Sequence, residues 1–170
     1  DWELIVIDGA SSSDSGRVLD EVAALDARVR VVRRDVEAGE YVRRNEAIQM
    51  ANGEIVALQD ARAWSHPRRL EIQVNDLLAN PARLANTIHS LRVSDELSLV
   101  NRLGAGLVND ESSLMFRRGP VISAVGYFDS VRAGADTEFR QRLASATKSK
   151  VPSLVKGAPL LITLRGEGDQ

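Results

Sequence analysis

The stretch Glu3-Leu4-Ile5-Val6-Ile7-Asp8 is a short apolar run that ends in an aspartate and leads into the turn residues Gly9-Ala10-Ser11-Ser12-Ser13-Asp14. An apolar run of this length, bounded by turn residues, predicts a buried β-strand. A second run of the same kind, Glu54-Ile55-Val56-Ala57-Leu58-Gln59, ends at Asp60. Each of these two predicted strands thus ends at an aspartate.

Helical patterns separate these strands. The first half reads as a helix over 14–25, a strand over 28–33, a helix over 40–51 and a helix over 67–78. We expect Asp14 or Ser15 to cap the first helix. This β-α-β-α-β-α order predicts a mostly parallel sheet flanked by helices. Ligands bind beyond the carboxyl ends of such strands, which is where Asp8 and Asp60 lie.

The second half is less regular, and we expect a smaller mixed β/α part there. Its predicted elements are a strand over 84–93, a loop or hairpin over 94–110, a strand over 113–117, helices over 120–125 and 135–146, and a strand over 159–164. The last five residues, 166–170, are expected to fray.

Composition narrows the class of protein. The chain has 170 residues, which suits one domain, and its formal net charge of −2 argues against a broad nucleic-acid surface. It has no cysteine, which excludes disulfides, thiolate zinc sites and cysteine nucleophiles in this chain. No apolar run approaches the roughly 20 residues that cross a bilayer.

A set of segments carries a family resemblance. In chain order they are 2–8, 39–45 with Arg43-Arg44-Asn45, 51–54, 59–67 with Trp64-Ser65-His66-Pro67, 112–118, 126–129, and 134–139 followed by Arg142. Together they resemble the nucleotide-sugar glycosyltransferases of family 2, which have the GT-A fold. The resemblance implies a single GT-A-like domain, with a nucleotide-binding half over 1–83 and an acceptor-side half over 84–170.

The resemblance also implies a reaction. Such an enzyme moves a sugar from a UDP- or GDP-linked donor to a glycan or lipid-linked acceptor, here with an inverting outcome and in bacterial surface polysaccharide synthesis. It implies a cytoplasmic location, or a peripheral one at the inner membrane. The expected partners are the nucleotide sugar and the glycan acceptor, with no nucleic acid; a homo-oligomer is a further arrangement to test.

The resemblance assigns roles to individual residues. Asp136 is the implied catalytic base, which takes the proton from the acceptor hydroxyl. Donor binding falls to Asp8, Arg44, Asn45, Asp60 and Arg62, and Trp64 would line the sugar or acceptor site. A divalent Mg²⁺ or Mn²⁺ ion is implied as well, with Asp60 as its remaining ligand.

This sequence departs from the family pattern in three places. Arg62 and Ala63 stand where the metal motif usually has aspartate, and Gly9 stands where a second aspartate often follows Asp8. Arg62 either clamps phosphate in place of the metal or marks a lost activity. The family's first strand and helix have no counterpart, so we expect two open edges within the sheet. Another segment or a second chain then covers them, or the fold is poorly stable.

Each site residue also has a plainer interpretation. In that interpretation Asp136 is a helix cap, Asp8 is a turn residue that closes a strand, Arg44 and Asn45 lie on a solvated helix face, and Trp64 is a core residue. We take His66 as a helix-start residue and His89 as structural. The alternative function is a degenerate, non-catalytic glycosyltransferase-like domain that binds a ligand or partner. A third is a doubly wound interaction module related by ancestry only.

Overall fold

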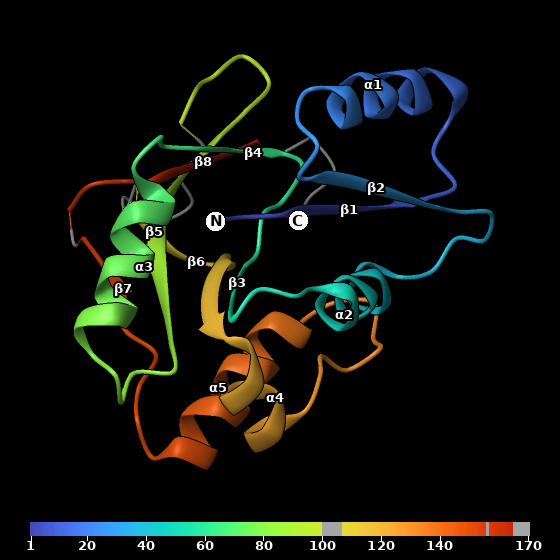
Figure 1. Ribbon diagram of the computed structural model, residues 1–170. Helices are drawn as coiled ribbons and strands as arrows, with labels where there is room; N and C mark the ends of the chain where they lie inside the picture. Colours follow the sequence, from blue (N-terminus) through green and yellow to red (C-terminus); the bar gives the residue numbers. More distant parts are fainter. Residues whose placement is uncertain (100–106, 156, 165–170) are drawn as a thin grey trace.

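The computed structural model describes residues 1–99, 107–155 and 157–164 (Figure 1). A two-stranded sheet holds β1 (Leu4–Gly9) and β2 (Val29–Arg34), which run parallel with Leu4 opposite Val29. Helix α1 (Ser13–Ala24) lies above this pair in Figure 1, and α2 (Glu40–Met50) lies below it. These four elements are the strands and helices that the sequence predicts for its first 51 residues.

The start of α1 differs from the expectation. Its N-cap residue is Ser12, and no side chain caps a backbone N–H group there. The prediction that Asp14 or Ser15 caps the helix is therefore wrong. Asp14 lies inside the first turn, where its charge still favours the positive end of the helix dipole.

The other strands form a six-stranded sheet. Its order is β3 (Ile55–Ala57), β6 (Leu107–Arg117), β5 (Ala85–Val93), β8 (Leu161–Leu164) and β4 (Ala63–Ser65), with β7 (Ser153–Leu154) also beside β5. The short strands β4 and β7 were not predicted, because two or three residues carry no readable alternation. Residues 107–110, expected in a loop, belong to β6. The rest of that expected loop at 100–106 and the tail at 165–170 lie outside the described residues.

The α/β fold class is confirmed, but β3 pairs differently from the expectation. It runs antiparallel to β6, with Val56 opposite Phe116, and it does not pair with β1 or β2. The six-stranded sheet is mixed: β5 is antiparallel to β6 but parallel to β7 and β8. Among the described residues no strand covers the second edge of β1. The first three strands therefore do not join into one parallel sheet, because nothing described bridges β1 to β3.

Three further helices complete the fold: α3 (Arg69–Ala79), α4 (Arg118–Val125) and α5 (Ala135–Thr147), all close to the predicted ranges. The main core lies between α2, α4, α5 and the six-stranded sheet. Phe128 stacks on Phe139 with ring centroids 4.1 Å apart, and Phe116 of β6 lies 5.9 Å from Phe139. This aromatic cluster fixes the start of α5 against β6, which positions the site described next.

Candidate functional site

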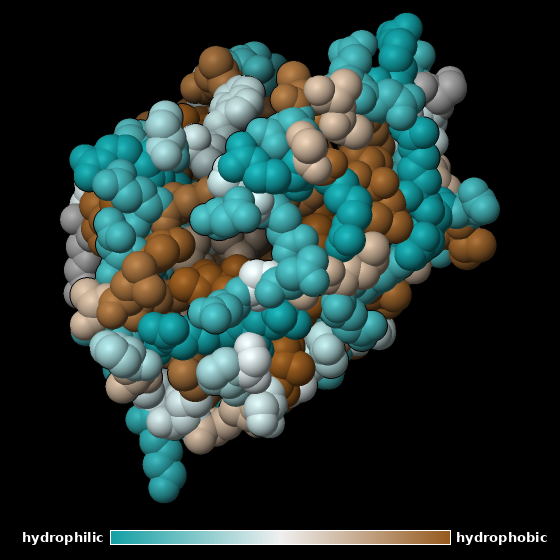
Figure 2. Space-filling model, in the orientation of Figure 1, coloured by the Kyte–Doolittle hydropathy of each residue, from teal (hydrophilic) through white to brown (hydrophobic). Residues whose placement is uncertain are grey.

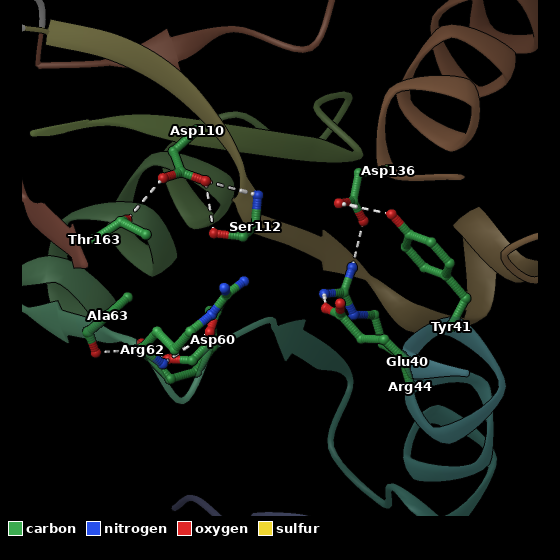
Figure 3. Close-up of polar contacts among 11 residues, drawn as sticks. Glu40, Tyr41, Arg44, Asp60, Arg62, Ala63, Asp110, Ser112, Asp136 and Thr163 are labelled. Atoms are coloured by element: carbon green, nitrogen blue, oxygen red, sulfur yellow. Dashed lines mark hydrogen bonds and ion pairs between the residues drawn. The ribbon is translucent and has the colours of Figure 1, made fainter. Parts of the chain in front are cut away.

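A cavity of about 460 Å³ lies between the segment after β3, the sheet strands β5, β6 and β8, and the start of α5. Asp60, Arg62, Arg92, Asp110, Asp136 and Thr163 are among the residues that line it. Figure 3 shows these walls: Asp60 and Arg62 below, Asp110 and Thr163 above, and Asp136 to the right. Asp60 and Asp136, which the sequence analysis singled out, thus face one cavity although their residue numbers differ by 76.

Asp60 forms a tight turn with Arg62. One carboxylate oxygen, Oδ1, accepts a hydrogen bond from the backbone N–H of Arg62 at 2.8 Å, and Arg62 Nη2 lies 3.6 Å from Oδ2. The Arg62 guanidinium points into the middle of the cavity (Figure 3). A guanidinium therefore stands beside the carboxylate that a metal would need.

These residues do not fit a divalent cation. Mg²⁺ and Mn²⁺ need several oxygen ligands around them. Within the described ranges no group of three or more histidine or acidic side chains is placed to hold a metal ion. Asp60 also faces a fixed positive charge, which repels a cation.

Asp136 lies in the first turn of α5 and is held from α2. Its Oδ1 pairs with Nη1 of Arg44, and its Oδ2 accepts a hydrogen bond from the Tyr41 hydroxyl at 3.2 Å. The N-cap residue of α5 is Gly134, at a φ of 85°, so the cap interpretation of Asp136 is wrong. Burial, and then the Asp136 charge, raise the pKa of Tyr41 above its ordinary value, so Tyr41 stays a hydrogen-bond donor.

Arg44 and Asn45 do not line the cavity. The Arg44 guanidinium forms ion pairs with both Asp136 and Glu40. Asn45 donates to the carbonyl of Phe128 at 2.7 Å and accepts from its N–H at 3.0 Å. Both side chains are half-buried and engaged with distant segments, so neither is simply solvated on a helix face.

Asp8 and Trp64 also lie away from the cavity lining. Asp8 is buried at the carboxyl end of β1, where hydrogen bonding by Ser11 holds the pKa of its carboxyl below the ordinary value. Trp64 is 55% exposed on β4, so the interpretation as a core residue is wrong. The donor role of Asp8 and the sugar-binding role of Trp64 stay predictions.

Both histidines behave as expected. His66 Nδ1 accepts a hydrogen bond from the backbone N–H of Arg68 just before α3, which suits a helix-start residue. His89 Nδ1 lies 3.1 Å from the Ser153 hydroxyl, a contact that ties β5 to β7. Neither lines the cavity.

Sequence reasoning missed Asp110. Its Oδ1 accepts hydrogen bonds from the backbone N–H and hydroxyl of Ser112, at 2.9 and 2.6 Å, and its Oδ2 accepts one from Thr163 at 3.2 Å. It is 7% exposed. The polar run Asn109-Asp110-Glu111 was the available signal, but it fell in a stretch expected to be a loop.

Sequence reasoning also missed Arg69, which is 1% exposed. Its guanidinium donates to Gln59 and Ser65, to the carbonyl oxygens of Leu58 and Ser113, and to Gln73. Burial lowers the pKa of Arg69 to about 10, so it is still charged at neutral pH. Arg69 thereby fixes the end of β3, immediately before Asp60.

Comparison with known proteins gives a family match. The family model described as "Glycosyl transferase family 2" matches residues 1–119. A Bacillus subtilis protein named "Putative teichuronic acid biosynthesis glycosyltransferase TuaG" is 29% identical over 94 residues, which are 55% of this chain and 37% of the relative. The uncharacterized protein y4gI of Sinorhizobium fredii is 38% identical over 81 residues, 47% of this chain and 9% of its own length.

Comparison with solved structures identifies the fold of this chain. The mannosyltransferase PcManGT of Pyrobaculum calidifontis, in complex with GDP-Man and Mn²⁺, matches with a TM-score of 0.67 and 18% identity over 96% of this chain and 47% of its own. TarS of S. aureus, in complex with UDP-GlcNAc, matches with a TM-score of 0.71 and 14% identity over 98% of this chain and 50% of its own. These likenesses show the GT-A fold.

The chain spans half or less of the length of each of these relatives. Across the described part of the chain, no helix has the length and apolar character needed to traverse a bilayer.

Proposed function

Because this chain belongs to glycosyltransferase family 2, we propose that its cavity transfers a sugar from a nucleotide-sugar donor to the hydroxyl of a glycan or lipid-linked acceptor. The observation that carries this proposal is the shared cavity of Asp60 and Asp136. The first follows the carboxyl end of β3 and forms one wall of the cavity. The second supplies a carboxylate within reach of an incoming hydroxyl.

Asp136 acts as the general base. In the inverting reaction the acceptor hydroxyl attacks the anomeric carbon while Asp136 takes its proton and the bond to the diphosphate breaks. The ion pair with Arg44 holds one oxygen of this carboxylate at the start of α5. The Tyr41 hydroxyl orients the second oxygen.

Arg62 meets the leaving diphosphate. Negative charge grows on this group as the glycosidic bond breaks, and a guanidinium can stabilise it through charge-assisted hydrogen bonds. Arg62 stands where the family has a metal-binding aspartate, and its side chain reaches into the cavity. The family's Mg²⁺ or Mn²⁺ is therefore not required by this proposal.

A second candidate is a non-catalytic domain that binds a nucleotide sugar. Two contacts favour it: Arg44 pairs with Asp136, and Arg62 stands beside Asp60. Both carboxylates of the proposed reaction thus already pair with a cation of this chain.

The acceptor, the donor and the cellular location of the reaction are part of the same proposal. The name of TuaG supports a bacterial cell-surface polysaccharide as the acceptor. The nucleotide sugars in the complexes of PcManGT and TarS support GDP- or UDP-linked donors. We propose that the reaction takes place on the cytoplasmic side, free or at the membrane surface.

Calorimetric titration with UDP and with GDP, each with and without Mn²⁺, tests this function. We expect one nucleotide to bind with the same affinity in both conditions. Arg62→Asp should weaken metal-free binding at least tenfold and make binding depend on Mn²⁺, whereas Arg17→Asp on the exposed face of α1 should change neither. Absence of binding by both nucleotides would contradict the proposal. Binding without sugar transfer or hydrolysis from any UDP- or GDP-sugar would favour the second candidate.

A further inference from the structure

We propose that Arg92 and Asp110 form a subsite for an acidic sugar, with a carboxylate or phosphate on Arg92 and a sugar hydroxyl on Asp110. The assignment of this sugar to the acceptor rests on the proposed transfer reaction. The subsite itself rests on three observations: the charge balance of the cavity, the position of Arg92 in the sheet, and the hydrogen bonds of Asp110.

Among the described residues that line the cavity, one cation, Arg92, pairs with no carboxylate. Asp60 faces Arg62, Glu111 pairs with Arg140, and Asp136 pairs with Arg44. Arg92 lines the same cavity and is half-buried. Within the described ranges it makes no hydrogen bond or ion pair.

A half-buried guanidinium without a counter-ion has lost part of its hydration and gained no partner. An anionic oxygen group from a ligand would supply that partner. The planar guanidinium matches both oxygens of a carboxylate or two oxygens of a phosphate, which gives the strongest class of hydrogen bond in proteins. The chemistry of this cavity wall therefore favours an anion.

Thr163 links Arg92 to Asp110. In the six-stranded sheet Thr163 of β8 lies opposite Arg92 of β5, and its hydroxyl donates to Asp110 Oδ2 at 3.2 Å. Oδ1 already accepts two hydrogen bonds from Ser112, but Oδ2 accepts only this one from the described residues. Each carboxylate oxygen can accept two, so Oδ2 has room for a ligand hydroxyl.

A carboxylate that accepts from a hydroxyl, next to a guanidinium that binds an anion, is complementary to a sugar that carries an acidic group. A cavity of about 460 Å³ falls in the size range of small-molecule sites. Asp110 and Thr163 lie on the wall opposite Asp60 and Arg62, with Asp136 to the side (Figure 3). An acceptor unit held there would present its hydroxyl toward the base.

NMR titration of the whole chain tests this subsite, with D-glucuronate, glycerol 3-phosphate and neutral D-glucose as probes. We expect at least one acid to bind about tenfold or more tightly than glucose, with shifts at Arg92 and Thr163. Tighter glucuronate binding identifies a carboxylate sugar, and tighter glycerol phosphate binding identifies a phosphate-bearing unit. Acids that bind no better than glucose would overturn the proposal.

Three variants and one control variant test which residues bind the acid. Arg92→Gln should reduce acid binding to the glucose level, and Arg92→Lys should retain part of it, because the charge stays but the planar fork is lost. Asp110→Asn should weaken the two sugars while the preference for the acid persists. Arg17→Gln removes the same charge from α1 and should change nothing; an equal loss there would reveal non-specific charge attraction and overturn the subsite.

UDP and GDP titrations of the same variants separate this subsite from the transfer reaction. If Arg92→Gln weakens nucleotide binding and not acid binding, Arg92 binds the diphosphate of the donor, and the proposal of an acidic-sugar subsite is wrong. If acids bind through Arg92 but neither nucleotide binds, the subsite stands and the transfer proposal fails.

Discussion

Asp136 shows how much one side chain depends on residues far away in the sequence. Arg44 and Tyr41 on α2 both contact its carboxylate, one through an ion pair and one through a hydroxyl. The two contacts hold the carboxylate in one orientation beside the cavity. A fixed orientation suits a general base, whereas a carboxylate already paired with Arg44 suits a binding domain, so a rate measurement at this residue distinguishes the two.

Asp136→Asn is expected to lower the rate of sugar transfer by about 100-fold or more, because an amide cannot take the proton of the acceptor hydroxyl. The rate of nucleoside diphosphate release measures the effect. Thermal unfolding should shift only modestly, since the amide keeps the shape of the side chain and can accept from Tyr41, although it loses the ion pair with Arg44.

Asp14→Asn is the matched control, because it removes one charge from the first turn of another helix, on an exposed side chain. It should leave the rate unchanged. A normal rate in Asp136→Asn would rule out the base role.

At the scale of elements, Arg69 joins α3 to the segment that follows β3 and to the middle of β6. It bonds to the carbonyl of Leu58 next to β3 and to that of Ser113 within β6, at 2.6 and 3.2 Å. Its contact with Gln59, at 2.6 Å, holds the residue before Asp60. The cavity wall that carries Asp60 and Arg62 is therefore anchored by a buried cation outside the cavity.

Arg69→Met is expected to destabilise the protein by about 3 kcal/mol or more, because it leaves several buried acceptors without a donor. Urea unfolding followed by circular dichroism measures the change. Arg68→Met, at the neighbouring exposed arginine paired with Glu71, should cost less than about 1 kcal/mol. Equal costs at the two positions would contradict the anchoring role of Arg69.

At the scale of the whole molecule, the two sheets differ in how well they are covered. The buried core clusters are built from the six-stranded sheet, its helices and α2, and contain no residue of β1 or β2. Leu4 of β1 is 39% exposed. Apolar surface is visible in this region, on the right of Figure 2. A two-stranded sheet with a free edge is only marginally stable on its own.

Hydrogen exchange should therefore begin in β1 and β2. We expect their amide groups to exchange at least about 100-fold faster than those at the centre of β5 and β6, because less apolar surface is exposed when the two-stranded sheet opens. Exchange measured by mass spectrometry at two protein concentrations checks this. Protection of β1 that rises with concentration would indicate that a second chain covers its edge, and equal protection of the two sheets would contradict the prediction.

The sequence predicted what depends on neighbouring residues. The strand at β1, the helix at α5 and the two aspartates at Asp60 and Asp136 follow from apolar periodicity, turn residues and an ordered family pattern. These features are local, or occur in the order that the family pattern has, so a single amino-acid sequence is enough to find them.

The tertiary structure decided the contacts between distant segments. Only the fold pairs β3 with β6, sets Arg44 against Asp136, and brings Arg92 and Asp110 to one cavity. A polar residue on a strand looks the same in sequence whether it faces solvent or a site. Its partner is fixed by strand order and register, which local periodicity does not encode.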